Sequence, residues 1–283
     1  MHKPVLLPEV IKNLGEINNG LFIDATFGEG GHSIEILKRK GKVLGIEWDE
    51  KQYKKAKTKF ESYIKSGTLK LINDNFCRIK DIAKKNNFFP VNGILFDLGL
   101  SMNQLASSGR GFSHKQLDDP LDMRLNLSLK VKAADLINSL NKDQLYEILA
   151  KYSEEVDSLR LVEAIISSRK IRRIEKVKDL IEIINKVTGA KEKVYARVFQ
   201  ALRIAVNDEL ENLKKALEAT LSILKPEGRI LIISFHSVED RVIKNFIKEK
   251  SLKLLNKKAI KSKTGNKFER SALLRVITQV SNF

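Results

Sequence analysis

Carboxylates and glycines in the first hundred residues have the spacing of a nucleotide-type site. Asp24 ends a short apolar run and is followed by the glycine-rich segment Phe27–His32, while Glu47 and Asp97 lie at the ends of two further apolar runs. Glycines permit positive φ and close approach of the backbone, and a helix that begins after them offers free N–H groups to a ligand. Open α/β sheets bind ligands at the carboxyl ends of their strands, so these acids are expected to lie around one ligand.

The charge beside the glycines indicates which ligand this is. A dinucleotide needs Gly-x-Gly-x-x-Gly to receive its pyrophosphate, whereas here a Gly-x-Gly-Gly turn at 28–31 lies close to the carboxylate of Asp24. That carboxylate repels a pyrophosphate but suits S-adenosylmethionine, which carries an ammonium and a sulfonium and no phosphate. Glu47 is expected to accept hydrogen bonds from ribose hydroxyls, the alternative being a solvated carboxylate beside Lys51. An NAD-dependent oxidoreductase remains the alternative enzyme class.

Alternating strand and helix patterns predict the elements that position these residues in a parallel α/β sheet. Strands are predicted at Leu21–Thr26, Val43–Glu47, Leu69–Ile72, Gly93–Leu98, Arg229–Phe235 and 271–280, and covering helices at His32–Lys40 and Glu50–Lys65.

Helical spacing replaces the strand pattern in the middle of the chain. We expect an all-helical domain at 108–200 inserted in a discontinuous α/β domain formed by 1–107 and 201–283; crossover helices without a core of their own are the alternative. Apolar positions from Val198 to Leu224 predict one long helix, ended by the Pro and Gly of 225–228.

Composition restricts the class of protein and its partners. The 283 residues carry a formal net charge of +17, which favours a polyanionic partner. The single cysteine, Cys77, cannot form an intrachain disulfide, and the four histidines lack metal-ligand spacing, so no metal is expected. The prolines and glutamate near the start interrupt any signal peptide, and no apolar run is long enough to span a membrane. A cytoplasmic protein with no membrane association is expected.

Seven sequence blocks, in order along nearly the whole chain, resemble the ribosomal RNA small subunit methyltransferase H family. They are His2–Leu7, Asp24–Ser33, Asp97–Ser101, Arg110–Ser113, Pro120–Arg124, Phe199–Ile204 and Phe235–Arg241. The resemblance implies a class I, Rossmann-like methyltransferase fold with an inserted helical domain. It also implies methylation of the exocyclic N4 of one cytidine in the decoding region of 16S rRNA, with S-adenosylmethionine as methyl donor. The expected partner is 16S rRNA within the small ribosomal subunit, and a homodimer is left open.

The resemblance also assigns roles to individual residues. Donor contacts are expected from Gly30, Gly31, His32, Glu47, Phe76, Asp97 and Gln104, in addition to Asp24 and Gly28 of the glycine turn; the candidate catalytic residues are Asp97, Ser101 and His236. For Phe76, packing on adenine and an ordinary core position are alternatives. Glu47 stands where the family usually has Asp, which keeps the carboxylate and lengthens its reach.

Asp97 is the leading catalytic candidate because the amine of cytosine is a poor nucleophile, its lone pair being delocalised into the ring. Transfer therefore needs an acceptor for the amino protons. Amino-methyltransferases of nucleic acids commonly place Asp or Asn followed by Pro-Pro-aromatic after the fourth strand, and the segment Asp97–Leu100 looks like a variant of that loop. A structural cap for the following turn is the alternative role for Asp97. Cys77 has no signature of a cytosine C5 nucleophile.

The residues after the fifth predicted strand and two basic runs concern the RNA. His236 is expected to contact the cytosine edge or a phosphate, and Ser237 with Asp240 forms a plausible helix-capping pair. Basic residues prevail from Arg241 to Arg275 and again in the run 169–178. Both runs suit phosphate contacts, with general lysine richness as the alternative.

Overall fold

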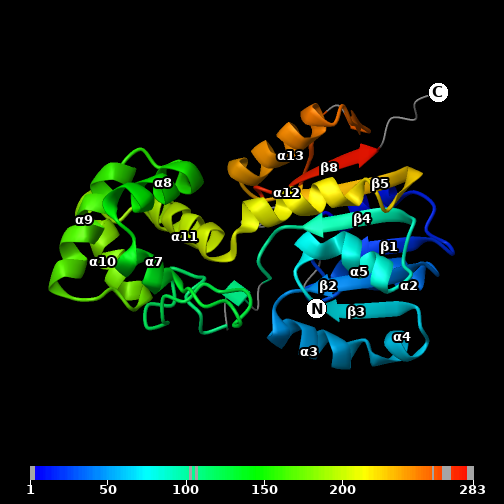
Figure 1. The fold of residues 1–283 in the computed structure, drawn as a ribbon, viewed down its shortest axis with the longest axis horizontal. Helices are drawn as coiled ribbons and strands as arrows, with labels where there is room; N and C mark the ends of the chain where they lie inside the picture. The colour runs from blue at the N-terminus through cyan, green and yellow to red at the C-terminus, as the bar shows by residue number, and fades with distance from the viewer. Residues whose placement is uncertain (1–3, 102–103, 106–107, 257, 263–268, 279–283) are drawn as a thin grey trace. The chain divides into compact units, whose positions relative to one another are not determined.

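The structure, a computed structural model, describes residues 4–101, 104–105, 108–256, 258–262 and 269–278 (Figure 1). The chain divides into two compact units. The first comprises Met1–Gly99 and Leu210–Phe283, and the second comprises Leu100–Glu209. The expected domain boundaries, at 107/108 and 200/201, both fall inside the second unit.

In the described part of the chain, the first unit contains one sheet. Its strands follow the order β3-β2-β1-β4-β5-β8-β6, and β7 pairs with β8. Its strands are β1 (Leu21–Asp24), β2 (Lys42–Glu47), β3 (Leu69–Asn73), β4 (Val91–Asp97), β5 (Leu224–Ser234), β6 (Lys253–Leu254), β7 (Ile260–Lys261) and β8 (Leu273–Thr278). Strands β1 to β5 are parallel, and β8 is antiparallel to β5. This confirms the predicted α/β class, a Rossmann-like methyltransferase fold. The order reverses between β1 and β4, the switch point at which open sheets bind ligands.

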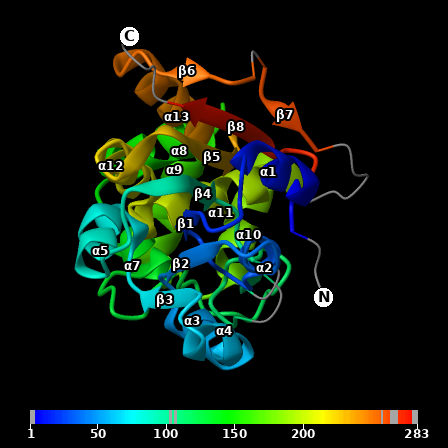
Figure 2. The same ribbon diagram turned by 90° about the vertical axis from the view of Figure 1, so that its right-hand side faces the viewer.

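Helices cover both faces of this sheet (Figure 2). Those on one face are α1 (Leu7–Leu14), α2 (Gly31–Lys38), α3 (Glu50–Lys59) and α4 (Glu61–Lys65). Those on the other face are α5 (Ile79–Lys85), which follows the 3₁₀ turn η1 (Phe76–Arg78), α12 (Glu209–Thr220) and α13 (Ser237–Glu249). Successive strand residues alternate between the two cores: Phe22 packs with the first set and Ile23 with the second.

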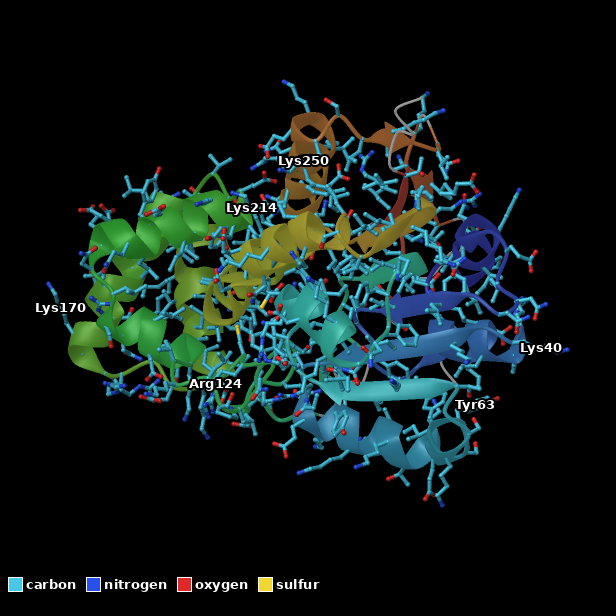
Figure 3. The ribbon with its side chains drawn as sticks, turned by 45° about the vertical axis from the view of Figure 1, so that its right-hand side comes forward. Lys40, Tyr63, Arg124, Lys170, Lys214 and Lys250 are labelled. Atoms are coloured by element: carbon cyan, nitrogen blue, oxygen red, sulfur yellow. The ribbon has the colours of Figure 1, made fainter. Side chains whose placement is uncertain are left out.

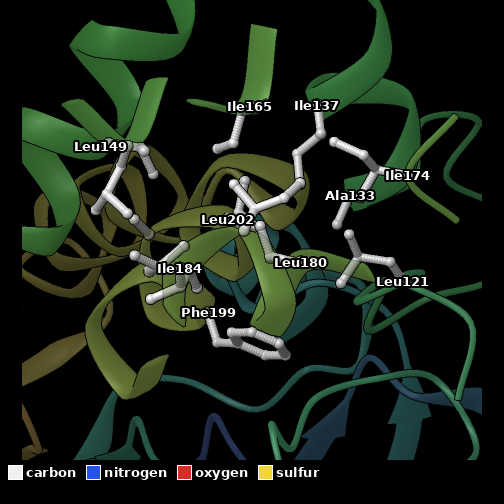
Figure 4. Packing of buried hydrophobic residues seen from close by; sticks show 14 of the residues in the cluster. Leu121, Ala133, Ile137, Leu149, Ile165, Ile174, Leu180, Ile184, Phe199 and Leu202 are labelled. Atoms are coloured by element: carbon white, nitrogen blue, oxygen red, sulfur yellow. The ribbon is translucent and has the colours of Figure 1, made fainter. Parts of the chain in front are cut away.

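The second unit is helical and has a buried core of its own, which argues against mere crossover helices. Its helices are α7 (Ala133–Ser139), α8 (Lys142–Ser153), α9 (Ser158–Ile171), α10 (Val177–Thr188) and α11 (Glu192–Asn207). Apolar residues at helical spacing meet in its centre, among them Ile137, Leu149, Ile165, Leu180 and Leu202 (Figure 4).

Two predictions about the long helix expected from Val198 to Leu224 were wrong. The single long helix is two helices, because Asp208 adopts a left-handed conformation with φ 50° between α11 and α12. Asn207 is the last residue of α11, and its side chain accepts a hydrogen bond from Leu125 N at 2.7 Å and donates one to Met123 O at 2.8 Å. Furthermore, the Pro-Gly segment 225–228 does not separate a helix from a strand, since β5 already begins at Leu224.

The described ranges include no helix that combines the length and the apolar character needed to cross a bilayer.

Candidate functional site

Asp24 lies at the end of β1 and ties the glycine-rich loop to α2. Its Oδ2 accepts a hydrogen bond from Ser33 Oγ at 2.6 Å, and its Oδ1 accepts one from Thr26 N at 3.3 Å. Only 2% of the residue is exposed. Burial raises its pKa, and the charge of Asp97 raises it further, against the opposing effects of Ser33 and His32. Asp24 therefore fixes the conformation of the glycine-rich loop through its hydrogen bonds to Thr26 and Ser33. The sequence pattern did not indicate Ser33 as its partner.

Glycine is required at two loop positions. Gly28 and Gly30 have φ of 53° and 74°, values that other residues rarely adopt. A Cβ on Gly30 would also lie 2.4 Å from the ring of Phe60, and one on Gly31 would lie 2.3 Å from Pro4. The loop thus has no room for side chains on these sides, and α2 begins at Gly31, one residue before the predicted start.

Glu47 is buried at the end of β2, with 8% of the residue exposed, so the solvated-carboxylate alternative is wrong. Its Oε2 accepts a hydrogen bond from Gly28 N and its Oε1 one from Asp49 N, both at 2.8 Å. Burial raises the pKa of Glu47 to about 7, helped by the charges of Asp49 and Asp24 and opposed by the two hydrogen bonds. Glu47 therefore both holds the loop and keeps acceptor capacity for a ligand, because each carboxylate oxygen has two lone pairs.

His32, near the start of α2, is buried and lies between the N-terminal segment and β4. Its Nε2 is 2.9 Å from Val5 O, and because a carbonyl only accepts, Nε2 carries the proton. Its Nδ1 lies 3.8 Å from Asp97 Oδ2. Burial lowers the pKa of His32, so the imidazole is neutral at pH 7 and this second contact is not an ion pair there.

Asp97, at the end of β4, is positioned by a residue that the sequence did not single out. The backbone N–H of Asp97 donates to Thr26 Oγ1 at 2.6 Å, which joins the tips of β1 and β4. About a quarter of its side chain is exposed, 23%. A Thr two residues after an acid at a strand end is the only sequence signal for this contact.

Phe76 begins η1, directly after β3. Its ring packs edge-on against Phe96, with centroids 5.8 Å apart and an interplanar angle of 86°. The ring is half-buried, so it is partly a core residue, and adenine packing on the remaining surface stays a prediction.

Ser101 and Gln104 belong to the second unit, where they bond each other. Ser101 N donates to Gln104 Oε1 at 2.9 Å, and Gln104 N donates to Ser101 Oγ at 3.2 Å. This reciprocal pair has the pattern of a capping box. The catalytic role of Ser101 and the donor contact of Gln104 stay predictions.

The cap of α13 differs from the predicted pair Ser237 and Asp240. The N-cap is His236, whose Nδ1 accepts from Glu239 N at 3.3 Å, and its Nε2 lies 3.0 Å from Glu239 Oε1. In return Glu239 Oε2 accepts from Phe235 N at 2.8 Å. Both ring nitrogens of His236 thus face Glu239, which gives the histidine a structural role; its catalytic role stays a prediction.

Asp240 pairs with a distant strand instead of capping the helix. Arg275 on β8 donates to its two carboxylate oxygens, Nε to Oδ1 at 2.6 Å and Nη2 to Oδ2 at 3.1 Å. Lys244 Nζ lies 2.8 Å from Oδ2. Burial acts to raise the pKa of Asp240, but the hydrogen bonds from Arg275 and Lys244 outweigh it and the pKa is lowered.

Both basic runs contain side chains that are engaged within the protein. In the run 169–178 most side chains are engaged within the second unit: Arg169 with Ile137 O, Arg172 with Asp179, Arg173 with Glu175 and Lys178 with Asp118. Lys170 extends away from the ribbon, as does Lys250 of the other run (Figure 3). Residues 257 and 263–268 of that second run lie outside the described residues.

The gathered carboxyl groups fit a cationic ligand. Asp24, Glu47 and Asp97 come from adjacent strands, and the charge of Asp97 raises the pKa of Asp24 while that of Asp24 raises the pKa of Glu47. An ammonium and a sulfonium relieve this mutual repulsion, whereas a pyrophosphate increases it. The residues present therefore suit S-adenosylmethionine and argue against the dinucleotide alternative.

Comparison with known proteins shows which proteins are similar to this chain in sequence. Residues 1–280 match the MraW methylase family. The ribosomal RNA small subunit methyltransferase H of Dictyoglomus thermophilum is 41% identical over 98% of this chain and 96% of its own, and that of Halothermothrix orenii is 37% identical over 99% of each. Among solved structures, an rRNA methylase from Streptococcus thermophilus matches 99% of each chain with 11% identity and a TM-score of 0.45, too low to add to the family match.

Proposed function

Because the chain belongs to the MraW methylase family, we propose that it methylates the exocyclic N4 of one cytidine in the decoding region of 16S rRNA. It is an S-adenosylmethionine-dependent ribosomal RNA methyltransferase. The observation that carries the finer proposal is the partly exposed side chain of Asp97, which lies at the switch point of the sheet beside the glycine loop. We also propose the small ribosomal subunit as partner and the cytoplasm as location.

The residues of the first unit divide the work between donor and acceptor. S-adenosylmethionine supplies an electrophilic methyl group on a sulfonium. Glu47 and the glycine loop hold the donor, with Asp24 fixing the loop. Asp97 and a neighbouring backbone carbonyl accept the hydrogen bonds of the cytosine amino group and help its nitrogen to pyramidalise, and Asp97 takes up the proton that the methylated nitrogen must lose. Such positioning is worth about 7–11 kcal/mol of the barrier, enough to proceed without a covalent nucleophile.

The direct test uses the full chain and its proposed substrate. Protein, tritiated methyl donor and small subunits from a strain lacking this modification are incubated, and the labelled nucleotide is identified by mass spectrometry. Label on N4 of a single 16S cytidine is expected. Label at another atom or RNA overturns the proposal, and RNA binding without label indicates an assembly factor.

Glu47 is expected to make donor binding depend on pH. Ribose hydroxyls donate to a carboxylate, so binding selects the ionised form of a group whose pKa is about 7. Donor affinity should therefore rise by up to about tenfold from pH 6 to pH 8, measured by calorimetry. The unliganded protein should show the opposite sign: because the folded state holds this proton to higher pH than the unfolded state, stability is lost as pH rises toward 7.

Two variants at position 47 test whether the pH dependence of donor binding comes from Glu47 and not from another titratable group. In Glu47→Gln the donor affinity should be lower and no longer rise through pH 7, whereas Glu47→Asp keeps the carboxylate and should keep a pH dependence. Burial lowers the pKa of His32 below its ordinary value, which moves its titration away from pH 7 toward more acidic pH. An unchanged pH profile in Glu47→Gln contradicts the assignment.

Thr26 is expected to position Asp97. Thr26→Val keeps the shape of the side chain but leaves Asp97 N–H without its acceptor, a loss of about 1–3 kcal/mol. We expect kcat to fall about tenfold, with an unchanged donor Kd, in single-turnover and calorimetric measurements. Thr26→Ser, which retains the hydroxyl, should restore kcat; equal losses in both variants contradict the role.

A further inference from the structure

The segment after Asp97 provides no aromatic ring for the target base. It continues as Leu98 and Gly99, and the next residue, Leu100, is also aliphatic. A flipped-out base is commonly held by stacking on aromatic side chains, which every base accepts through its π-face. The ring must therefore come from another element if the base is held in this way.

Strand β5 brings an aromatic residue to the same place. β4 and β5 are parallel neighbours in which Asp97 pairs with Ile233, and Leu98 N donates to Ile233 O at 3.1 Å. Phe235 directly follows the end of β5, so it lies at the same edge of the sheet as Gly99. Leu95 and Ile233 pack in one core, and Phe235 packs against that core too. By the alternation of strand residues, Asp97 and Phe235 project toward the same face.

The ring of Phe235 lies directly against the main chain of Gly99. A Cβ added to Gly99 would be 2.7 Å from Cε2 and 2.8 Å from Cζ of that ring. The ring is only half-buried. The absent side chain at Gly99 therefore leaves room for an aromatic ring two residues after the catalytic candidate.

A buried carboxylate fixes the backbone of this aromatic residue. Glu239 is 3% exposed, and its Oε2 accepts hydrogen bonds from Phe235 N at 2.8 Å and His236 N at 3.4 Å. Residues locked in this way are suited to a substrate site because little freedom is lost on binding. We propose that Phe235 is the stacking platform for the target cytosine beside Asp97, a substrate contact that rests on the function proposed above.

The test compares aromatic and aliphatic side chains at position 235. Phe235→Leu keeps an apolar packing group without a π-face, and kcat/KM for the RNA should fall about 5- to 150-fold, as loss of one stacked base predicts. Phe235→Tyr keeps the ring and should stay within about threefold of the parent. Donor Kd and thermal midpoint should be the same in both variants. A packing role alone would lower the thermal midpoint or the donor affinity of Phe235→Leu together with its kcat/KM.

A second variant displaces the ring without altering it. Gly99 has no positive φ, so Gly99→Ala is conformationally allowed, and the atoms nearest to its added Cβ belong to the ring of Phe235. We expect an RNA kcat/KM loss in Gly99→Ala that disappears when Phe235 is already Leu. Additive losses in the double variant overturn the proposal.

The outcomes also separate this inference from the function on which it rests. If the parent protein labels no 16S cytidine, the proposed function fails. If it labels one and Phe235→Leu retains the parental kcat/KM, the proposed function stands and the stacking role is wrong.

Discussion

Replacing Asp97 with Asn or Ala is expected to lower kcat by about 10²- to 10⁴-fold, the range for losing a positioned acid–base group. Asn keeps the size of the side chain but replaces one acceptor oxygen with an NH₂ group, which points hydrogens at the amino protons of the substrate. The tip of β4 is otherwise unchanged, because Thr26 holds the backbone of residue 97 and not its carboxylate. Single-turnover methyl transfer measures the loss, and calorimetry should show that donor affinity, to which the charge of Asp97 also contributes, falls much less than kcat.

A donor-side variant provides the matched control for this prediction. Glu47→Gln acts at the tip of β2, which is separated from β4 by β1, and should weaken donor binding more than it lowers the single-turnover rate at saturating donor. The two variants are therefore expected to show opposite patterns. An Asp97→Asn protein that loses donor affinity and turnover to the same extent would make Asp97 a donor ligand only.

The part of the site formed by strand tips could be predicted from the sequence. Apolar runs that end in Asp24, Glu47 and Asp97 identify buried parallel strands, and parallel strands place their carboxyl ends together whatever the details of packing. Glycines at 28 and 30 were predictable for the same reason, since only the backbone conformation of the loop matters. The local sequence pattern is therefore sufficient to predict those site residues whose position depends only on the order and direction of the strands.

The sequence did not specify contacts that depend on side-chain rotamers or on distant segments. Nothing in the pattern distinguishes Ser237 from His236 as the cap of α13, because both precede a polar residue at the third helical position. The break at Asp208 was equally hidden, since apolar spacing continues through it. The partner of Asp240 lies 35 positions away on β8, at a position that the sequence pattern does not connect with it.

Arg275→Met is expected to reduce the free energy of unfolding by about 3–5 kcal/mol, because it leaves the carboxylate of Asp240 buried without its main partner. Only 11% of the Arg275 side chain is exposed, so water cannot replace the two hydrogen bonds. Chemical denaturation at pH 7 measures the change. Lys244→Met removes the other cation near Asp240, but that side chain is 59% exposed and its loss should cost less than about 1 kcal/mol.

The pH dependence of this destabilisation tests its cause. The pKa of Asp240 is lowered in the folded protein, so the pair contributes stability above the ordinary carboxyl pKa, and this contribution is lost as pH falls through the lowered value. The difference between the parent and Arg275→Met should therefore be largest near neutrality and narrow below about pH 4. Adding Asp240→Asn to Arg275→Met removes the buried charge and should recover part of the lost stability at pH 7. A difference that is constant with pH, or a double variant less stable than Arg275→Met, would mean that Arg275 stabilises β8 by packing and not by neutralising Asp240.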